Sequence, residues 1–167
     1  MAFGKFPSFA KFIESFEESR QRELDARERG LSFEERVLAR RKAQERNFVE
    51  VHARVDVREP DDVDGDRHYR LRVRIVDLVS GDPDVDADVK RNIEQQSDVF
   101  VAIRYGDRMG IKDGIPDQFL QPNAELRMKG EWIPREQAQN HGGEKMSVLH
   151  FTHHPFGFTC AAEKCFS

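Results

Sequence analysis

Residues 67–75 alternate between basic and apolar side chains, and this is the most informative pattern in the sequence. A period of two predicts a half-buried strand with an apolar face on a core and a cationic face outside. Arginines bind phosphates and aromatic rings stack on bases, so the cationic face predicts a site for single-stranded nucleic acid. The alternative is an ordinary polar strand surface covered by glutamates of other elements. With its neighbouring strands, the predicted surface comprises His52, Arg54, His68, Arg70, Arg72, Arg74, Phe100 and Arg104.

A second group of residues has the types that bind a metal ion. His150 and His154 share one face of a predicted strand, and Cys160 and Cys165 follow closely. Imidazoles and thiolates are the ligands that zinc prefers, so zinc is the one cofactor that the sequence suggests. The cysteine spacing is wider than in common zinc knuckles, and ordinary hydrogen-bonded histidines are the simpler interpretation. A catalytic arrangement with His150 as general base beside His68 lacks a nucleophile at a defined spacing.

The N-terminal segment carries a third candidate, an apolar stripe. Ser8 fits a helix N-cap, and residues 32–35 read Ser-Phe-Glu-Glu, a capping box that opens a second helix. We therefore expect a two-helix hairpin over residues 1–48. Its stripe could bind a partner protein, the chain's own barrel or a membrane interface, and the glutamates on its polar side disfavour the membrane. The stripe consists of Phe3, Phe6, Phe9, Phe12, Ile13 and Phe16.

Charge and composition limit the function classes. Of the 167 residues, 35% are charged, and the net charge of −4 excludes a protein that coats nucleic acid with its whole surface. Residues 1–48 carry a net charge of +2 and the remainder −6, with acid concentrated at 59–66 and 82–88. Any basic surface is therefore local, with acidic loops beside it.

The sequence predicts a cytoplasmic protein. No apolar run reaches the roughly 20 residues that span a bilayer, and the N-terminus has no continuous apolar core of a secretory signal. Without export, Cys160 and Cys165 are expected to be reduced thiols.

From residue 49 the hydrophobic period changes from 3.6 to 2. The pattern predicts strands at 49–58, 67–77, 98–105, 124–133 and 146–154, with a short helix near 87–95. Five such strands after a helical extension predict an α+β, mainly β protein: a five-stranded OB-like antiparallel barrel at 49–158 with an N-terminal two-helix hairpin. A second helix between the third and fourth strands is disfavoured by the glycines and prolines of 106–122. Residues 159–167 are expected to be a short C-terminal tail.

Two segments resemble an uncharacterised bacterial family of OB-like domains. One is Asp-Gly-Asp-Arg-His-Tyr-Arg at 64–70, and the other is Gly142-Gly143 with His-Phe-Thr-His-His-Pro at 150–155 and Gly157-Phe158. Gly-Glu-Trp at 130–132 lies between them, and the likeness spans about residues 50–158. The family usually has Trp where this chain has Phe151, and its members often begin with an export signal. The resemblance implies the fold and no catalytic residue.

These patterns favour a non-enzymatic binding module whose cationic barrel face contacts nucleic acid. The alternative is a protein-interaction subunit that joins a larger assembly through its Phe-rich N-terminal helix. A metal-dependent hydrolase is the third candidate.

Overall fold

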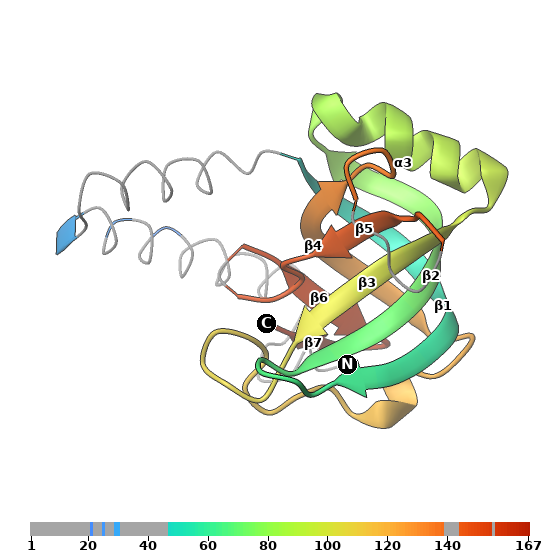
Figure 1. The fold of residues 1–167 in the computed structure, drawn as a ribbon. Coiled ribbons are helices and arrows are strands. Elements are labelled where there is room, and N and C mark those ends of the chain that lie inside the picture. The colour runs from blue at the N-terminus through green and yellow to red at the C-terminus, as the bar shows by residue number, and fades with distance from the viewer. Residues whose placement is uncertain (1–20, 22–24, 26–28, 31–46, 139–143, 155) are drawn as a thin grey trace.

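The computed structural model describes residues 21, 25, 29–30, 47–138, 144–154 and 156–167. These residues form a mainly β protein built on a closed barrel of five strands (Figure 1). The ring runs β1-β2-β3-β5-β4 and closes by pairing of β4 with β1. The predicted helical hairpin lies almost entirely outside the described residues. The strands are β1 Phe48–Asp62, β2 His68–Gly81, β3 Asp98–Arg104, β4 Glu125–Ile133 and β5 Ser147–His150.

Strand β1 closes the barrel because both of its edges are paired. It pairs with β2 along most of its length and with β4 from Phe48 to Arg54. Its alternate residues Val49, Val51 and Val55 are at most 1% exposed, so the period of two predicted for this segment matches the burial observed. The inward residues of the other strands complete a single apolar core inside the ring.

The predicted antiparallel barrel is wrong at one pair of strands. Strands β3 and β5 are parallel, with Val99 beside Ser147 and Val101 beside Leu149. The reason is geometric: an odd number of strands cannot alternate direction all the way around a closed ring. Strand β5 is antiparallel to β4, and this forces it to run parallel to its other neighbour, β3.

Helix α3, Pro83–Gln95, covers one end of the barrel and lies in the connection between β2 and β3 (Figure 1). Asp82 caps it by accepting a hydrogen bond from the backbone N–H of Asp84, and Pro83 occupies the first turn. The connection from β3 to β4 holds only the short 3-10 helix η1, Asp117–Phe119. No described helix is long and apolar enough to cross a membrane.

A buried carboxylate fastens α3 to the barrel. Asp88 is 7% exposed, and its Oδ2 accepts hydrogen bonds from Trp132 Nε1 at 2.8 Å and Ser147 Oγ at 2.9 Å. Its Oδ1 accepts a bond from the half-exposed Arg91 at 2.7 Å. Asn92 adds an amide contact to Ser147 at 3.2 Å. Charge-assisted bonds of this kind hold the helix over β4 and β5.

The C-terminal tail forms a β-hairpin that the sequence analysis did not predict. Strands β6, Phe158–Ala161, and β7, Lys164–Phe166, extend the sheet from the edge of β4 that β5 leaves open. Cys160 and Cys165 face each other in this hairpin and form a disulfide, which corrects the expectation of two reduced thiols. The fifth strand ends at His150, earlier than expected, because the chain must turn before β6 can pair with β4.

Two glycines allow that turn to pack against β4. A Cβ atom on Gly130 would collide with the carbonyl of His150, and one on Gly157 would collide with the carbonyl of Phe151. Phe151 itself has a positive φ of 53°, which reverses the chain direction. Gly130 and Gly157 therefore pack closely against the backbone of the His-Phe-Thr-His-His segment, which is one of the segments that resemble the OB-like family.

Replacing Asp88 with Ala should lower the free energy of unfolding by about 2–4 kcal/mol, because the buried Trp132 Nε1–H loses its acceptor. Alanine keeps helix propensity, so the loss would report the network and not the helix itself. Urea unfolding followed by Trp132 fluorescence measures it. The matched control Arg91→Ala breaks the same ion pair at its exposed side and should cost below about 1 kcal/mol. Equal losses of unfolding free energy in the two variants would contradict a stabilising role for the buried hydrogen bonds of Asp88.

Candidate functional site

The cationic residues predicted for nucleic acid lie on the outer surface of β1, β2 and β3. Arg54 is directly opposite Arg74 across β1 and β2, and His68 is opposite Arg104 across β2 and β3. His52 is exposed and lies 3.8 Å from Asp77. The structure therefore gathers these cations on one surface, but it gathers carboxylates there as well.

Arg70 and Arg72 share one carboxylate. Glu59 lies near the end of β1 and accepts a bond from Arg72 Nε at 2.7 Å, with Arg70 at 3.2 Å. The hydrogen bond to Glu59 raises the pKa of Arg72 above its usual value. Both arginines are therefore held by a protein carboxylate in the place where the sequence predicts a phosphate.

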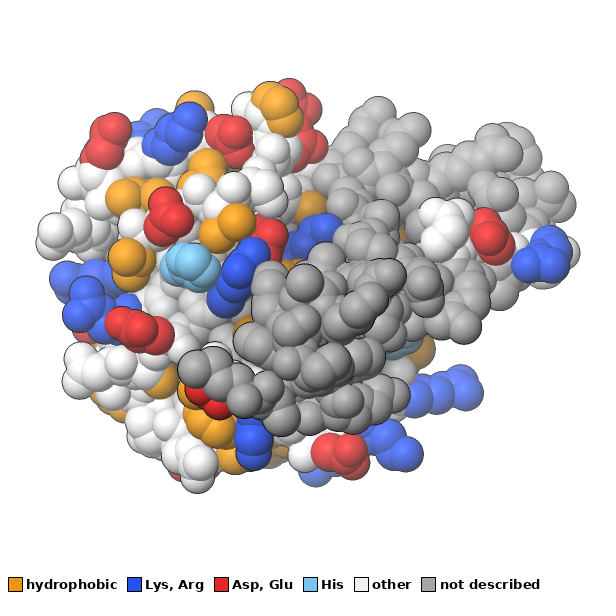
Figure 2. Space-filling model, turned by 180° about the vertical axis from the view of Figure 1, so that it is seen from behind, with side chains coloured by type: hydrophobic (Ala, Val, Ile, Leu, Met, Phe, Trp, Pro, Cys, Tyr) orange, Lys and Arg blue, Asp and Glu red, His pale blue; other side chains and the backbone are white. Residues whose placement is uncertain are grey.

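Two further arginines of this surface, Arg74 and Arg104, are paired with carboxylates in the same way. Arg74 lies 3.5 Å from Asp98 and 3.9 Å from Asp56. Arg104 contacts Asp66 at 2.7 Å and Asp107 at 2.9 Å. The Asp107 bond raises the pKa of Arg104, and the same bond lowers the pKa of Asp107. The face of the molecule seen in Figure 2 likewise mixes acidic, basic and hydrophobic side chains in its described part.

Phe100, the ring predicted to stack on a base, is covered. It is 3% exposed and packs with Ala138, Met146 and Val148 in a small apolar cluster outside the barrel. The guanidinium of Arg70 lies 5.7 Å from its ring centroid. Ala138 and Met146, both in the connection between β4 and β5, thus occupy the space that a base would need.

The four residues proposed as zinc ligands are not brought together. Cys160 and Cys165 bond to each other, and His150 Nε2 lies 3.0 Å from Glu131. His154 lies in the turn after β5, and the part of the chain that the structure describes contains no cluster of metal-ligating side chains. The Phe-rich stripe of residues 3–16 lies outside the described residues.

The sequence did not single out the end of the barrel opposite α3, which we call the mouth: residues 58–67 and 105–123 (Figure 1). Here the rings of Tyr69 and Tyr105 stack with centroids 3.9 Å apart and planes 6° apart. Arg58 lies over the far face of Tyr69 at 5.0 Å, and Arg67 lies over Tyr105 at 5.3 Å. The result is a four-layer stack of cation, ring, ring and cation.

Polar contacts fix this stack between the two loops of the mouth. Tyr105 donates its hydroxyl to Asp61 at 2.7 Å, which raises the pKa of the phenol. The backbone N–H of Ile115 donates to the Tyr69 hydroxyl at 3.1 Å. Tyr105 was recognisable only as the end of a strand, because its stacking partner is 36 positions away in the sequence.

Charge and exposure also distinguish the mouth. Its two segments contain eight acidic and four basic residues, a net charge of −4. Three of the acids, Glu59, Asp66 and Asp107, bind arginines of β2 and β3, whereas Asp62, Asp64 and Asp113 are exposed. Val63 and Met109, one from each segment, are 67% and 50% exposed. The mouth therefore combines acidic groups with exposed apolar side chains and a preformed aromatic stack.

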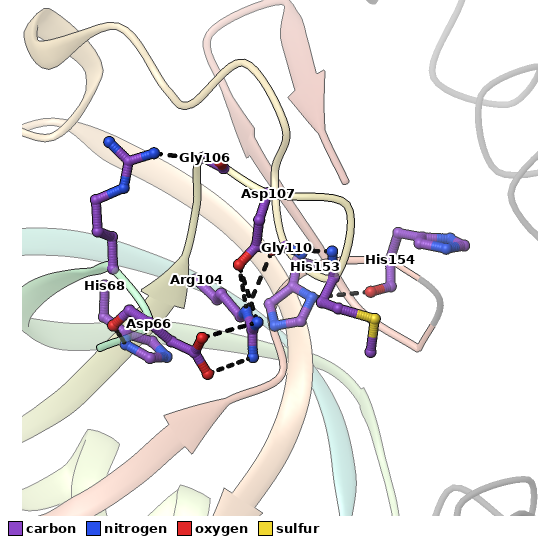
Figure 3. A network of polar contacts seen from close by, with 10 residues as sticks. Asp66, His68, Arg104, Gly106, Asp107, Gly110, His153 and His154 are labelled. Carbon is purple, nitrogen blue, oxygen red and sulfur yellow. Dashed lines mark hydrogen bonds and ion pairs between the residues drawn. The ribbon is translucent and has the colours of Figure 1, made fainter. Parts of the chain in front are cut away.

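A buried histidine lies beside the mouth in the turn after β5 (Figure 3). His153 is 7% exposed, and its Nδ1 donates to the carbonyl of His154 at 2.8 Å. Burial lowers its pKa, and the nearby charges of Arg104, His154 and His68 lower it further, while the carbonyl bond acts in the opposite direction. Arg104 is itself bound by Asp66 and Asp107. The geometry favours a neutral imidazole.

Comparisons with protein-family models, with curated proteins and with solved structures find no match for this chain. Its function must therefore be argued from its own residues.

Neutral His153 should make stability depend on pH. The pKa of His153 in the folded state lies below the unfolded value of about 6.5. The contribution of the neutral imidazole to the free energy of unfolding is therefore complete above about pH 6.5, and it is lost as the pH falls through the folded pKa. In His153→Asn, the amide can still donate to the His154 carbonyl but does not titrate. Urea unfolding between neutral and acidic pH should show that the difference in free energy of unfolding between wild type and variant decreases as the pH falls. Parallel curves would contradict this account.

Proposed function

We propose that the chain is a non-enzymatic binding module that takes a protein partner with a basic surface at the mouth of its barrel. The observation that carries this proposal is the mouth itself, with its net charge of −4 and the exposed Val63 and Met109 among the carboxylates. Protein interfaces combine exposed apolar groups with complementary charge, and the sign of the charge selects the partner.

We further propose that the barrel is OB-like. The five-stranded ring and the resemblance of residues 50–158 support this, and helix α3 departs from it by preceding β3 instead of following it. A shared fold supports a scaffold with binding loops at its ends and implies no reaction.

Nucleic acid is the second candidate, favoured by the row of arginines on the outer surface of β2 and β3. It ranks lower because Glu59 already holds Arg70 and Arg72, and because Phe100 is covered. A phosphate could bind these arginines only by displacing the carboxylate that already holds them. A metal-dependent hydrolase ranks third, since the described ligand candidates are apart.

Binding through the Phe-rich segment and a cytoplasmic location remain predictions. The Cys160–Cys165 bond favours an oxidising compartment over the cytoplasm, because disulfides are rare where thiols are kept reduced.

Reversing charge at the mouth should abolish binding of a basic protein surface. The double variant Asp64→Lys with Asp113→Lys changes two exposed residues, one in each mouth segment. The control, Glu94→Lys with Glu136→Lys, makes the same change at the α3 end. Titration of a blocked glycine–serine peptide carrying arginines at low salt should give a loss of binding of about tenfold or more in the first variant and little change in the second. Equal losses would place the interaction elsewhere.

The second candidate has its own test. If the strand surface binds nucleic acid, Glu59→Gln releases two arginines and should strengthen binding of a fluorescent single-stranded oligothymidine, measured by anisotropy. The double variant Arg70→Glu with Arg72→Glu should weaken binding. It should also reduce the slope of log K against log salt concentration by the amount expected for about two lost phosphate contacts. Binding that is indifferent to both changes would eliminate this surface.

A further inference from the structure

Arg67 shows how the mouth holds a guanidinium group. Its guanidinium lies over the Tyr105 ring at 5.3 Å and donates to the carbonyl of Gly106 at 3.2 Å. A ring face and a carbonyl acceptor are together the elements that recognise an arginine side chain. The molecule thus contains an example of the ligand chemistry that this position accepts.

The platform beneath Arg67 is rigid. Tyr69 is 8% exposed and supports the inner face of Tyr105. Arg58, below Tyr69, is only 15% exposed and is paired with Asp61 and Asp117. Asp61 also accepts the Tyr105 hydroxyl, so both rings are positioned before any ligand arrives. A preformed platform lowers the entropy cost of binding.

The side chain of Arg67, which covers the ring of Tyr105, has fewer contacts than the platform beneath it. Arg67 is exposed, and its side chain has no ion pair with any carboxylate in the part of the chain that the structure describes. This distinguishes it from Arg58 and Arg104, each of which contacts two carboxylates. Removing Arg67 from the ring therefore breaks one hydrogen bond and one cation–π contact.

We propose that Tyr105 is the docking platform for an arginine side chain of a protein partner, and that Arg67 occupies this platform until the partner displaces it. The inference rests on the proposed function and identifies the group that the partner supplies. The exposed Asp62, Asp64 and Asp113 of the mouth attract a cationic segment. The flat guanidinium stacks on the ring, whereas a lysine ammonium is more strongly hydrated and has no plane to stack.

The test uses the full chain, a blocked glycine–serine peptide carrying arginines, and the same peptide with lysines in their place. Arg67→Ala uncovers the ring and removes one positive charge. The matched control Arg108→Ala removes the same charge from an exposed position of the mouth without uncovering the ring. Calorimetry or amide chemical shifts should show that Arg67→Ala tightens binding of the arginine peptide by about threefold to tenfold more than Arg108→Ala does. The lysine peptide should gain less.

Replacing Tyr105 with Leu in the Arg67→Ala background should remove that gain. If this double variant does not fold, the comparison of Arg67→Ala with Arg108→Ala still decides. Equal tightening in those two variants, or an equal gain for the lysine peptide, would overturn the platform and leave charge attraction at the mouth intact. Absence of binding by either peptide to any variant would overturn the proposed function and the inference together.

Discussion

The pairing of β1 with β4 is the contact on which the rest of the molecule depends. It turns a sheet into a ring, and the ring gives the inward valines of β1 an interior that excludes water. Burial of apolar area is the main stabilising contribution in a domain of this size. Closure also pairs both edges of β1 over residues 48–54, which leaves this part of the strand no edge for association with another chain.

Ring closure with five strands has a second consequence, because one pair must be parallel. The chain meets this condition by sending β5 between β3 and β4, and β5 is short. Strand β5 pairs with residues 131–133 of β4, and the disulfide-linked hairpin pairs with residues 126–129 of the same strand. Gly130 and Gly157 permit the sharp turn between the two strands, since neither position has room for a side chain.

The two ends of the barrel differ in what fills them. The α3 end is sealed by a buried carboxylate whose oxygens accept bonds from Trp132, Ser147 and Arg91. The mouth is formed by two acidic loops around a stack of two tyrosines. A satisfied buried network resists change, whereas exposed loops on a rigid scaffold are the usual location of binding groups. This contrast is why the proposed function is assigned to the mouth.

Charge pairing explains why the outer surface of β1, β2 and β3 is no longer the first candidate for the binding site. The acidic loops were expected to flank the basic strands, but Glu59 and Asp66 turn back onto the arginines of β2 and β3. Sequence neighbours could not reveal this, because the pairs join residues 11, 13 or 38 positions apart. A surface that is cationic in sequence is therefore locally neutralised in space.

The sequence by itself determined the five strands of the ring and which of their side chains face inward, because alternation along an extended chain is a local property. The sequence also indicated a helix near 87–95, which begins earlier, at Pro83, where Asp82 caps it. The parallel pair, the Cys160–Cys165 bond, the Arg–Glu pairing and the tyrosine stack were decided only by the tertiary structure. Each depends on the direction and register of strands that are distant in sequence, and register is fixed by closure and packing of the whole ring.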